Sequence, residues 1–122
     1  MDLSVIIINK NYKKYIENCI SSCQGQKTKY LYEIIVIDDG STDGSLKLIE
    51  KFKNQNIRIF KTKNKGIEKA SNLGLKKSTG KFIMRVDSDD YLRNNCIEIL
   101  MNSMNKKKYS FVYSDYFLIN EK

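Results

Sequence analysis

Runs of apolar and β-branched residues alternate along the whole chain with segments in which apolar residues recur every three or four positions. The runs predict strands, and the periodic segments between them predict helices. The predicted strands cover residues 3–8, 32–37, 57–60, 82–86 and 109–119. Because a strand, a helix and a second parallel strand form a right-handed crossover unit, this alternation predicts an α/β fold with a mainly parallel sheet. The run at residues 82–86 is expected to be a buried strand.

Each predicted helix has one apolar face. We expect Thr42 or Asp43 to cap the second helix, Asn94 or Asn95 to cap the fourth, and Gly80 to end the third. The residues expected to face inward are Tyr12, Tyr15, Ile16, Cys19, Ile20 and Cys23 in the first helix, Leu46, Ile49 and Phe52 in the second, Ile67, Ala70, Leu73 and Gly74 in the third, and Ile97, Leu100, Met101 and Met104 in the fourth.

The length and composition narrow the class of protein. A chain of 122 residues can bury one hydrophobic core, so we expect a single domain over residues 1–122. No apolar run is long enough to span a membrane, and the first residues do not have the pattern of a signal peptide. Three cysteines are an odd number without a metal-site spacing, which favours a reduced, cytoplasmic protein.

The net charge of +8 is carried mostly by Lys. Lys lacks the planar fork with which Arg contacts bases and phosphates, and the basic residues are scattered rather than gathered in a stripe. These two features argue against nucleic acid as a partner. They favour attraction to anionic nucleotides, or peripheral association with an anionic membrane surface.

Polar clusters follow four of the predicted strands. They cover residues 9–11, 38–43, 61–64 and 87–90. In a parallel sheet the carboxyl ends of the strands lie at one edge, and ligands bind in the crevice outside that edge. The sequence therefore predicts a single ligand site built by several strand ends.

Three acids stand close together in the last of these clusters, at Asp87, Asp89 and Asp90. Their like charges repel, and each carboxylate is costly to desolvate. Carboxylate oxygens suit Mg²⁺ or Mn²⁺, ions that substrate phosphates often share, so one interpretation is a metal and diphosphate site. The other is an acidic N-terminal cap that favours the dipole of the following helix.

The acidic cluster at residues 38–43 also has more than one interpretation. Gly40 and Gly44 let the backbone approach a ligand, and a carboxylate can accept a hydrogen bond from a base imide or a ribose hydroxyl. A well-capped turn between strand and helix explains the same residues. An EF-hand loop does not fit, because a strand rather than a helix precedes it. A receiver-like domain would need a phosphoacceptor Asp after the third strand, and residues 60–63 contain none.

Taken together, the motifs resemble those of family 2 glycosyltransferases, in the correct order and over nearly the whole chain. The resemblance implies a GT-A fold, which is a Rossmann-like, mainly parallel sheet with helices on both faces. It also implies a hexosyltransferase-like enzyme that uses a nucleotide-diphosphate-sugar donor in glycan or cell-surface polysaccharide synthesis. The matching segments are Ser4–Ile7, Asn11, Ile34–Asp43, Asn64–Gly66, Ala70, Asn72, Gly74–Leu75, Gly80, the DXD motif Asp87–Asp90, and Val112–Asp115.

The resemblance assigns roles to particular residues. The turn after the first strand would line the base pocket, and an acid of the Asp38–Asp39 pair would bind the base. Asp87 would face the ribose or the sugar. Asp89 would hold Mg²⁺ or Mn²⁺ on the diphosphate, where the metal stabilises the departing nucleotide. The nucleotide-binding residues implied in this way are Ile8, Asn9, Asn11, Asp38, Asp39, Asn72, Asp87 and Ser88.

The chain departs from the family pattern at several points. Ile8 and Asn94 stand where the family often has Pro, Lys10 replaces an aromatic residue or Arg, and Ser71 replaces a common Arg. The family's acceptor half, which carries the general base, does not follow, and Asp115 belongs more naturally to the donor half. We therefore expect an incomplete GT-A domain with no catalytic base assigned. It would act on a saccharide or lipid-linked acceptor, or serve as a non-catalytic nucleotide-sugar-binding domain that needs a protein partner or oligomer.

Overall fold

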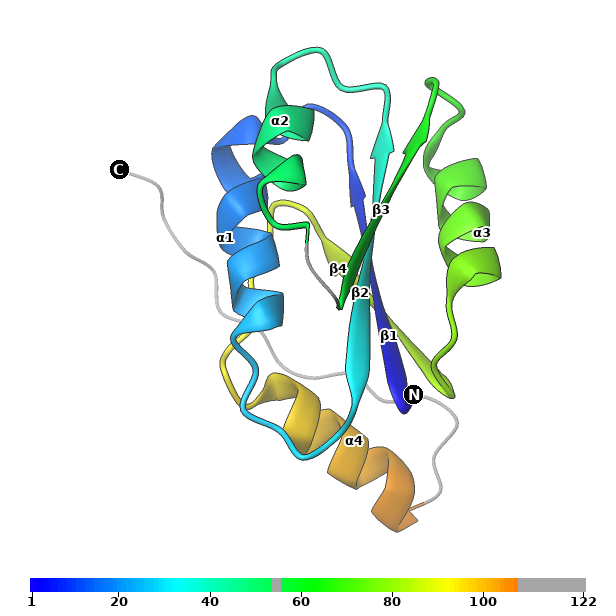
Figure 1. Cartoon of the computed structure of the whole chain (residues 1–122). Helices are drawn as coiled ribbons and strands as arrows, with labels where there is room; N and C mark the ends of the chain where they lie inside the picture. Colours follow the sequence, from blue (N-terminus) through cyan, green and yellow to red (C-terminus); the bar gives the residue numbers. More distant parts are fainter. Residues whose placement is uncertain (54–55, 108–122) are drawn as a thin grey trace.

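The structure, a computed structural model, describes residues 1–53 and 56–107 (Figure 1). Strands and helices alternate through this part of the chain, as the sequence predicts. The predicted strand at residues 109–119, with the segment Val112–Asp115, lies outside the described residues. The described elements are β1 (Leu3–Asn9), α1 (Lys13–Gln24), β2 (Tyr32–Asp39), α2 (Ser45–Glu50), β3 (Ile57–Thr62), α3 (Ile67–Lys77), β4 (Phe82–Asp87) and α4 (Cys96–Lys107).

The four described strands form one parallel sheet in the order β3-β2-β1-β4. The register places Asn9 beside Asp38 and Ile8 beside Asp87. Each strand runs one or two residues further than predicted, because the polar residues at its end still pair with a neighbouring strand. The polar clusters therefore begin inside the sheet, and their side chains meet at its carboxyl edge.

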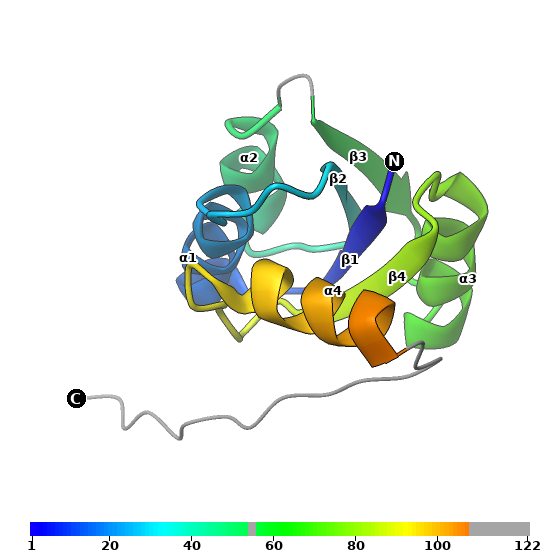
Figure 2. The ribbon, with the colours of Figure 1, turned by 90° about the horizontal axis from the view of Figure 1, so that it is seen from below.

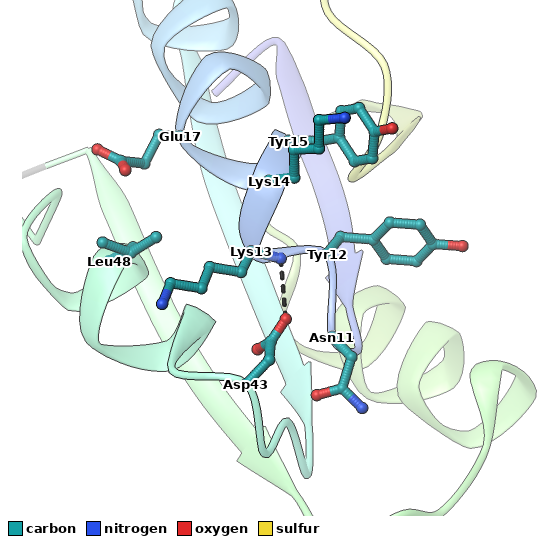
Figure 3. A pocket seen from close by; sticks show the side chains of 8 residues that line it. All are labelled: Asn11, Tyr12, Lys13, Lys14, Tyr15, Glu17, Asp43 and Leu48. Carbon is teal, nitrogen blue, oxygen red and sulfur yellow. Dashed lines mark hydrogen bonds between the residues drawn. The ribbon is translucent and has the colours of Figure 1, made fainter. Parts of the chain in front are cut away.

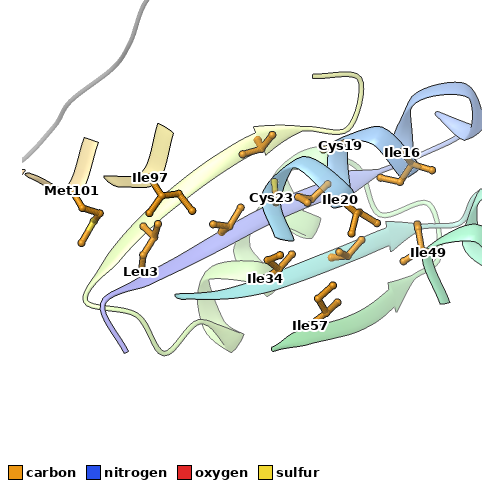
Figure 4. Close-up of a cluster of buried hydrophobic side chains, with 14 residues drawn as sticks. Leu3, Ile16, Cys19, Ile20, Cys23, Ile34, Ile49, Ile57, Ile97 and Met101 are labelled. Carbon is orange, nitrogen blue, oxygen red and sulfur yellow. The ribbon is translucent and has the colours of Figure 1, made fainter. Parts of the chain in front are cut away.

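Helices cover both faces of the sheet, which confirms the predicted architecture (Figures 1 and 2). The larger core lies beneath α1, α2 and α4 (Figure 4), and a smaller one lies beneath α3. Fully burying an aliphatic side chain contributes about 1.5–3 kcal/mol, so the larger core supplies most of the driving force for folding. Its fully buried aliphatic residues are Val5, Ile7, Ile16, Ile20, Ile34, Val36, Ile49 and Ile97.

β4 is an edge strand among the described strands, so the expectation of a buried strand is wrong. Of its six residues only Val86 is buried, and Ile83 is 42% exposed. The reason is that α3 packs mainly over β2 and β1 and leaves the same face of β4 largely uncovered. A short apolar run does not show by itself which neighbours will cover it.

Most of the predicted inward positions on the helices are buried or half-buried, but two are exposed. Tyr12 precedes α1 and is 42% exposed, and Ile67, the first residue of α3, is 61% exposed. In α2, the predicted Leu46 is half-buried, and Leu48, which was not predicted, packs against the larger core. Both errors fall at or before the first turn of a helix, where the helical spacing has not yet fixed the direction of the side chain.

The side-chain hydrogen bonds at the starts of α2 and α4 follow the predicted caps only in part. Gly44, at φ 88°, directly precedes α2, and Asp43 Oδ1 accepts the N–H of Ser45 at 2.9 Å from one residue further out. At the start of α4, Gln26 Oε1 accepts the N–H of Ile97 at 2.8 Å, where a neighbouring asparagine was expected to cap. A distant segment thus satisfies an N–H that a helix leaves unpaired at its start.

Gly80 is not the C-terminal stop of α3. The helix ends at Lys77, and Ser78 takes the C-cap. At Gly80 the chain passes directly against β1, where an added Cβ would lie 2.4 Å from the backbone N of Ser4. Glycine is required here by the close approach of two backbone segments.

Glu33 joins the first three strands to the connection between α3 and β4. Its carboxylate accepts Ser4 Oγ at 2.7 Å, both the N–H and the Oγ1 of Thr79 at 2.8 Å, and Arg58 Nη2 at 2.9 Å. Burial raises the pKa of the Glu33 carboxyl, but these hydrogen bonds outweigh it and hold the pKa below its usual value. The ionised form is therefore the one that stabilises the fold.

Replacing Glu33 by glutamine is expected to lower the free energy of unfolding by about 1–3 kcal/mol at pH 7, because buried donors lose a charged acceptor. The folded-state pKa lies below the unfolded value of roughly 4.3, so this difference is present above that pH and shrinks as the pH falls through the folded-state pKa. Urea unfolding at pH 7 and near pH 3 measures both effects. Glu50→Gln, at an exposed position, is the control, and an equal loss at both pH values would contradict the explanation.

Candidate functional site

The acidic turn, residues 87–90, follows β4 at the carboxyl edge of the sheet. The N–H of Asp90 donates to the carbonyl of Asp87 at 2.9 Å and closes the turn. One carboxylate oxygen from each of Asp87, Asp89 and Asp90 lies within 4.8 Å of the other two, and all three residues are exposed. Ser88, predicted to bind nucleotide, is buried with 2% of its surface exposed. The turn thus presents three acids to solvent and directs its serine inward.

The charges of the acidic turn are poorly compensated by the described side chains. Burial, Asp89 and Asp87, in that order, raise the pKa of the Asp90 carboxyl. Arg85 Nη2 lies 3.8 Å from Asp87 Oδ1, and exposed ion pairs of this kind stabilise little. Three converging carboxylates are the ligand chemistry that Mg²⁺ and Mn²⁺ prefer, so the residues fit a hard divalent cation.

Asp38 is buried inside a polar cluster that joins β1, β2 and α2. Its Oδ1 accepts Asn9 Nδ2 at 2.9 Å and Ser41 Oγ at 2.7 Å, and its Oδ2 accepts the N–H of Ser41 at 3.1 Å. Asn9 Nδ2 also lies 2.9 Å from Ser45 Oγ. Asn9 Oδ1 is buried and has no hydrogen-bond partner in the described part of the chain. The hydrogen bonds of Asp38 and Asn9 therefore join the ends of β1 and β2 to the start of α2 beneath the site.

Asp39 is equally buried but contacts a different segment. Its Oδ1 accepts Thr62 Oγ1 at 2.6 Å and the N–H of Lys65 at 2.8 Å, and its Oδ2 accepts the N–H of Gly66 at 2.9 Å. The hydrogen bond from Thr62 lowers the pKa of the Asp39 carboxyl against the effect of burial, and the two N–H groups and the charge of Lys10 lower it further. Asp39 is therefore ionised and fixes the loop between β3 and α3.

Asn11 connects the loop after β1 to the loop after β2. It has a left-handed backbone conformation, φ 60°, which asparagine tolerates better than most residues. Its N–H donates to Ser41 Oγ at 3.0 Å, and its Oδ1 accepts the N–H of Thr42 at 2.7 Å. The N–H of Lys13 donates to Asp43 Oδ2 at 3.0 Å beside it (Figure 3). These hydrogen bonds hold the loop after β1 and the loop after β2 in one arrangement at the carboxyl edge of the sheet.

An open hollow of about 560 Å³ lies next to this edge, between the start of α1 and α2 (Figure 3). It shares only Asn11 with the predicted nucleotide-binding residues and contains none of the acidic turn. We therefore define the site by the strand ends rather than by this hollow. The residues that line the hollow are Asn11, Tyr12, Lys13, Lys14, Tyr15, Glu17, Asp43 and Leu48.

The structure brings most of the predicted site residues to one edge. Ile8 and Asn9 end β1, the two acids Asp38 and Asp39 end β2, and Asp87 ends β4, all in register. Asn72 belongs to α3 rather than to a strand end, and it is exposed. The participation of each residue in ligand binding stays a prediction.

No individual role was predicted from the sequence for some residues of the site. Thr62, Gly66 and Ser45 are the partners of the predicted acids and amide. The signal for Thr62 lies in the register, because it is directly opposite Asp39 at the end of the neighbouring strand. Partners of this kind can be sought once the order of the strands is known.

Known proteins match the chain in sequence. A model described as glycosyl transferase family 2 matches residues 4–122. The poly(ribitol-phosphate) β-N-acetylglucosaminyltransferase TarS of Staphylococcus aureus is 36% identical over 102 residues, which cover 80% of this chain and 18% of TarS. The glycosyltransferase GlyG of Streptococcus pneumoniae is 34% identical over 122 residues, which cover 98% of this chain and 40% of GlyG. The chain thus spans less than half the length of these relatives.

Solved structures match the fold. TarS 1–349 in complex with UDP has a TM-score of 0.77 at 32% identity, over 87% of this chain and 32% of that one. The mannosyltransferase PcManGT of Pyrobaculum calidifontis, solved with GDP-Man and Mn²⁺, has a TM-score of 0.70 at 22% identity, over 84% of this chain and 31% of that one, and it bears on the fold alone. The resemblance seen in the sequence motifs is confirmed. The chain belongs to glycosyl transferase family 2, and its described part has the GT-A type of α/β fold.

Proposed function

We propose that this chain binds a nucleotide-diphosphate-sugar together with Mg²⁺ or Mn²⁺, as the donor-binding part of a glycosyltransferase. The observation that carries the proposal is the convergence of three carboxylates in the acidic turn, beside the end of β1, which is itself paired with the end of β2. Membership of the family and the likeness to TarS, which has been solved with UDP, support the same site. The enzyme would transfer a sugar to a saccharide or lipid-linked acceptor hydroxyl in glycan or cell-surface polysaccharide synthesis.

We assign the metal to Asp89, with Asp87 and Asp90 beside it in the acidic turn. When bound, the metal neutralises charge on the diphosphate leaving group. The acids themselves would bind the cation and hold it at the carboxyl edge, and Asp87, the last residue of β4, would face the ribose or the sugar. The buried Ser88 contributes through the backbone of the turn rather than through an exposed hydroxyl.

Of the two acids that end β2, we assign Asp39 to the base. A carboxylate has about four acceptor positions, and three of those on Asp39 are taken by Thr62, Lys65 and Gly66. The position left on Oδ2 would accept an imide N–H of the base. Asp38 lies within its own cluster with Asn9 and supports the loop that surrounds the base.

The proposed location is cytoplasmic, at the inner face of a membrane. The described cysteines are free thiols, which suits a reducing compartment. Within residues 1–53 and 56–107, no helix is both long and apolar enough to cross a bilayer. Attraction of the basic chain to an anionic surface would supply a peripheral association.

Isothermal titration with uridine diphosphate and Mn²⁺ tests donor binding directly. We expect a single site whose affinity is lost when EDTA removes the metal and restored when Mn²⁺ is added in excess. Guanosine and thymidine diphosphates, titrated in the same way, show which base the site prefers. If the folded protein binds none of the three in the presence of Mn²⁺, the proposed function is wrong.

A further inference from the structure

Three side chains at three- and four-residue spacing form a polar stripe along α1 and just beyond its end. They are Cys19, Ser22 and Gln26, which we call the α1 stripe. Each one hydrogen-bonds the backbone of residues 87–97, the segment that contains the acidic turn and leads from it into α4. Cys19 and Ser22 lie on one face of α1. Gln26 follows the helix and is joined to it by the hydrogen bond of its Nε2 to the carbonyl of Ser22 at 3.1 Å. The helix and the residue just beyond it therefore contact the acidic turn at its start and the following segment at several later points.

The start of the acidic turn is held by Cys19. Its Sγ lies 3.4 Å from the carbonyl oxygen of Asp87, the same oxygen that accepts the N–H of Asp90 within the turn. Cys19 is fully buried, and its thiol donates to this carbonyl. The side chain therefore bonds the backbone at the point where the turn begins.

The segment after the acidic turn is held by the other two residues. Ser22 Oγ accepts the N–H of Leu92 at 2.9 Å and donates to the carbonyl of Cys19 at 2.8 Å. Gln26 Nε2 donates to the carbonyl of Arg93 at 2.6 Å, and its Oε1 accepts the N–H of Ile97 at 2.8 Å. Residues 91–95 belong to no helix or strand, so these side chains supply contacts that secondary structure would otherwise provide.

The acidic turn needs such restraint more than an ordinary turn does. Its three carboxylates are exposed and repel one another, and Coulomb repulsion favours conformations that spread them apart. A binding site gains affinity when its ligand groups are already close to their bound positions. Contacts from a packed helix can hold the backbone against this repulsion, while the carboxylates themselves stay free to bind.

We infer that the α1 stripe positions the acidic turn for the divalent cation, and that Cys19, Ser22 and Gln26 set the affinity for the metal without touching it. The inference rests on the proposed function, since it assigns positioning residues to the same metal site. These neutral side chains bond the backbone of residues 87–97 and not the metal. They would contribute to metal binding in the way that residues around a metal's ligands do in other proteins, by holding the ligands in place.

The test compares Mn²⁺ affinity in four variants of the whole chain, using the electron paramagnetic resonance signal of free Mn²⁺ and no nucleotide. Ser22→Ala and Gln26→Met each remove hydrogen bonds of the stripe at nearly constant volume, and each is expected to weaken Mn²⁺ binding by about 10-fold. Ser22→Thr keeps the hydroxyl oxygen and is expected to restore the affinity. Thr28→Val is the matched control, because it removes a hydroxyl that bonds Glu98 Oε1 at 2.7 Å on α4 and not the acidic turn.

A second readout is amide hydrogen exchange at Leu92 and Ile97, which should become faster in the two stripe variants and not in Thr28→Val. If the wild-type chain binds Mn²⁺ and the folded stripe variants bind it equally well, the inference is wrong and the proposed function stands. If Ser22→Thr loses as much affinity as Ser22→Ala, the hydroxyl is not the cause and the inference is wrong. If the wild-type chain binds neither Mn²⁺ nor any nucleoside diphosphate, the proposed function and the inference fail together.

Discussion

Replacing Asp89 by asparagine is expected to weaken Mn²⁺-dependent binding of uridine diphosphate by at least about 100-fold. Replacing a residue that only supports a metal ligand already costs up to about 100-fold in metal affinity, and the loss of a ligand should cost at least as much. The substitution keeps the size of the side chain and removes one of the three charges that converge in the acidic turn. Isothermal titration with Mn²⁺, and again with EDTA, measures the loss. Because the proposed role of Asp89 is electrostatic, the metal-independent part of nucleotide binding should be unchanged.

The matched control for this variant is Asp2→Asn, the same chemical change at the opposite end of the sheet. The Asp2 carboxylate accepts the N–H of Leu31 at 2.9 Å, so this variant affects local packing but not the acidic turn. Its affinity for the nucleotide with Mn²⁺ should equal that of the wild type. If the metal-dependent affinity of Asp89→Asn equals that of the wild type, the assignment of the metal to Asp89 is wrong.

Gly80→Ala is expected to cause the largest loss of stability, about 3 kcal/mol in the free energy of unfolding, the upper part of the usual cost of overpacking. The new Cβ would lie 2.4 Å from the backbone N of Ser4 and 2.5 Å from the carbonyl carbon of Leu3. Both contacts are to backbone of the central strand, which cannot move aside as a flexible side chain can. Urea unfolding monitored by circular dichroism measures the change.

Gly25→Ala is the control for the effect of adding a methyl group to a glycine. There the new Cβ would meet only the carbonyl oxygen of Ser21, at 3.3 Å, and the backbone φ of −83° suits alanine. The change in stability should stay within about 1 kcal/mol, as for compatible Gly→Ala changes. Similar losses in the two variants would show that the close approach to β1 is not the cause.

The sequence predicted the described helices and strands well, because the spacing of apolar residues and the positions of polar residues are local properties of the chain. The order of strands and helices follows from the apolar runs, and the site edge follows from polar residues at strand ends such as Asn9 and Asp87. Both depend on residues that are neighbours in the chain. The strand ends were placed one or two residues early because Asp38, Asp39 and Thr62 are polar and yet still pair within the sheet.

What the sequence could not show depends on contacts between distant segments. The exposure of β4 is set by where α3 packs, and the segment after the acidic turn is bonded by partners about 70 residues away, such as Ser22 and Gln26. No local pattern distinguishes these polar residues from others that face solvent. Their role becomes visible only when α1 lies beside the turn.

The role that we propose for Asp39 in binding the base, added to its contacts within the fold, would limit how this site can evolve. The carboxylate that we assign to the base also holds the loop between β3 and α3 through Thr62, Lys65 and Gly66. A substitution that changed the preferred base would at the same time release the loop, so selection for a new donor meets resistance at this position. We expect lineages that switch donors to do so through neighbours without a second duty, such as the exposed Lys10, whose charge already acts on Asp39.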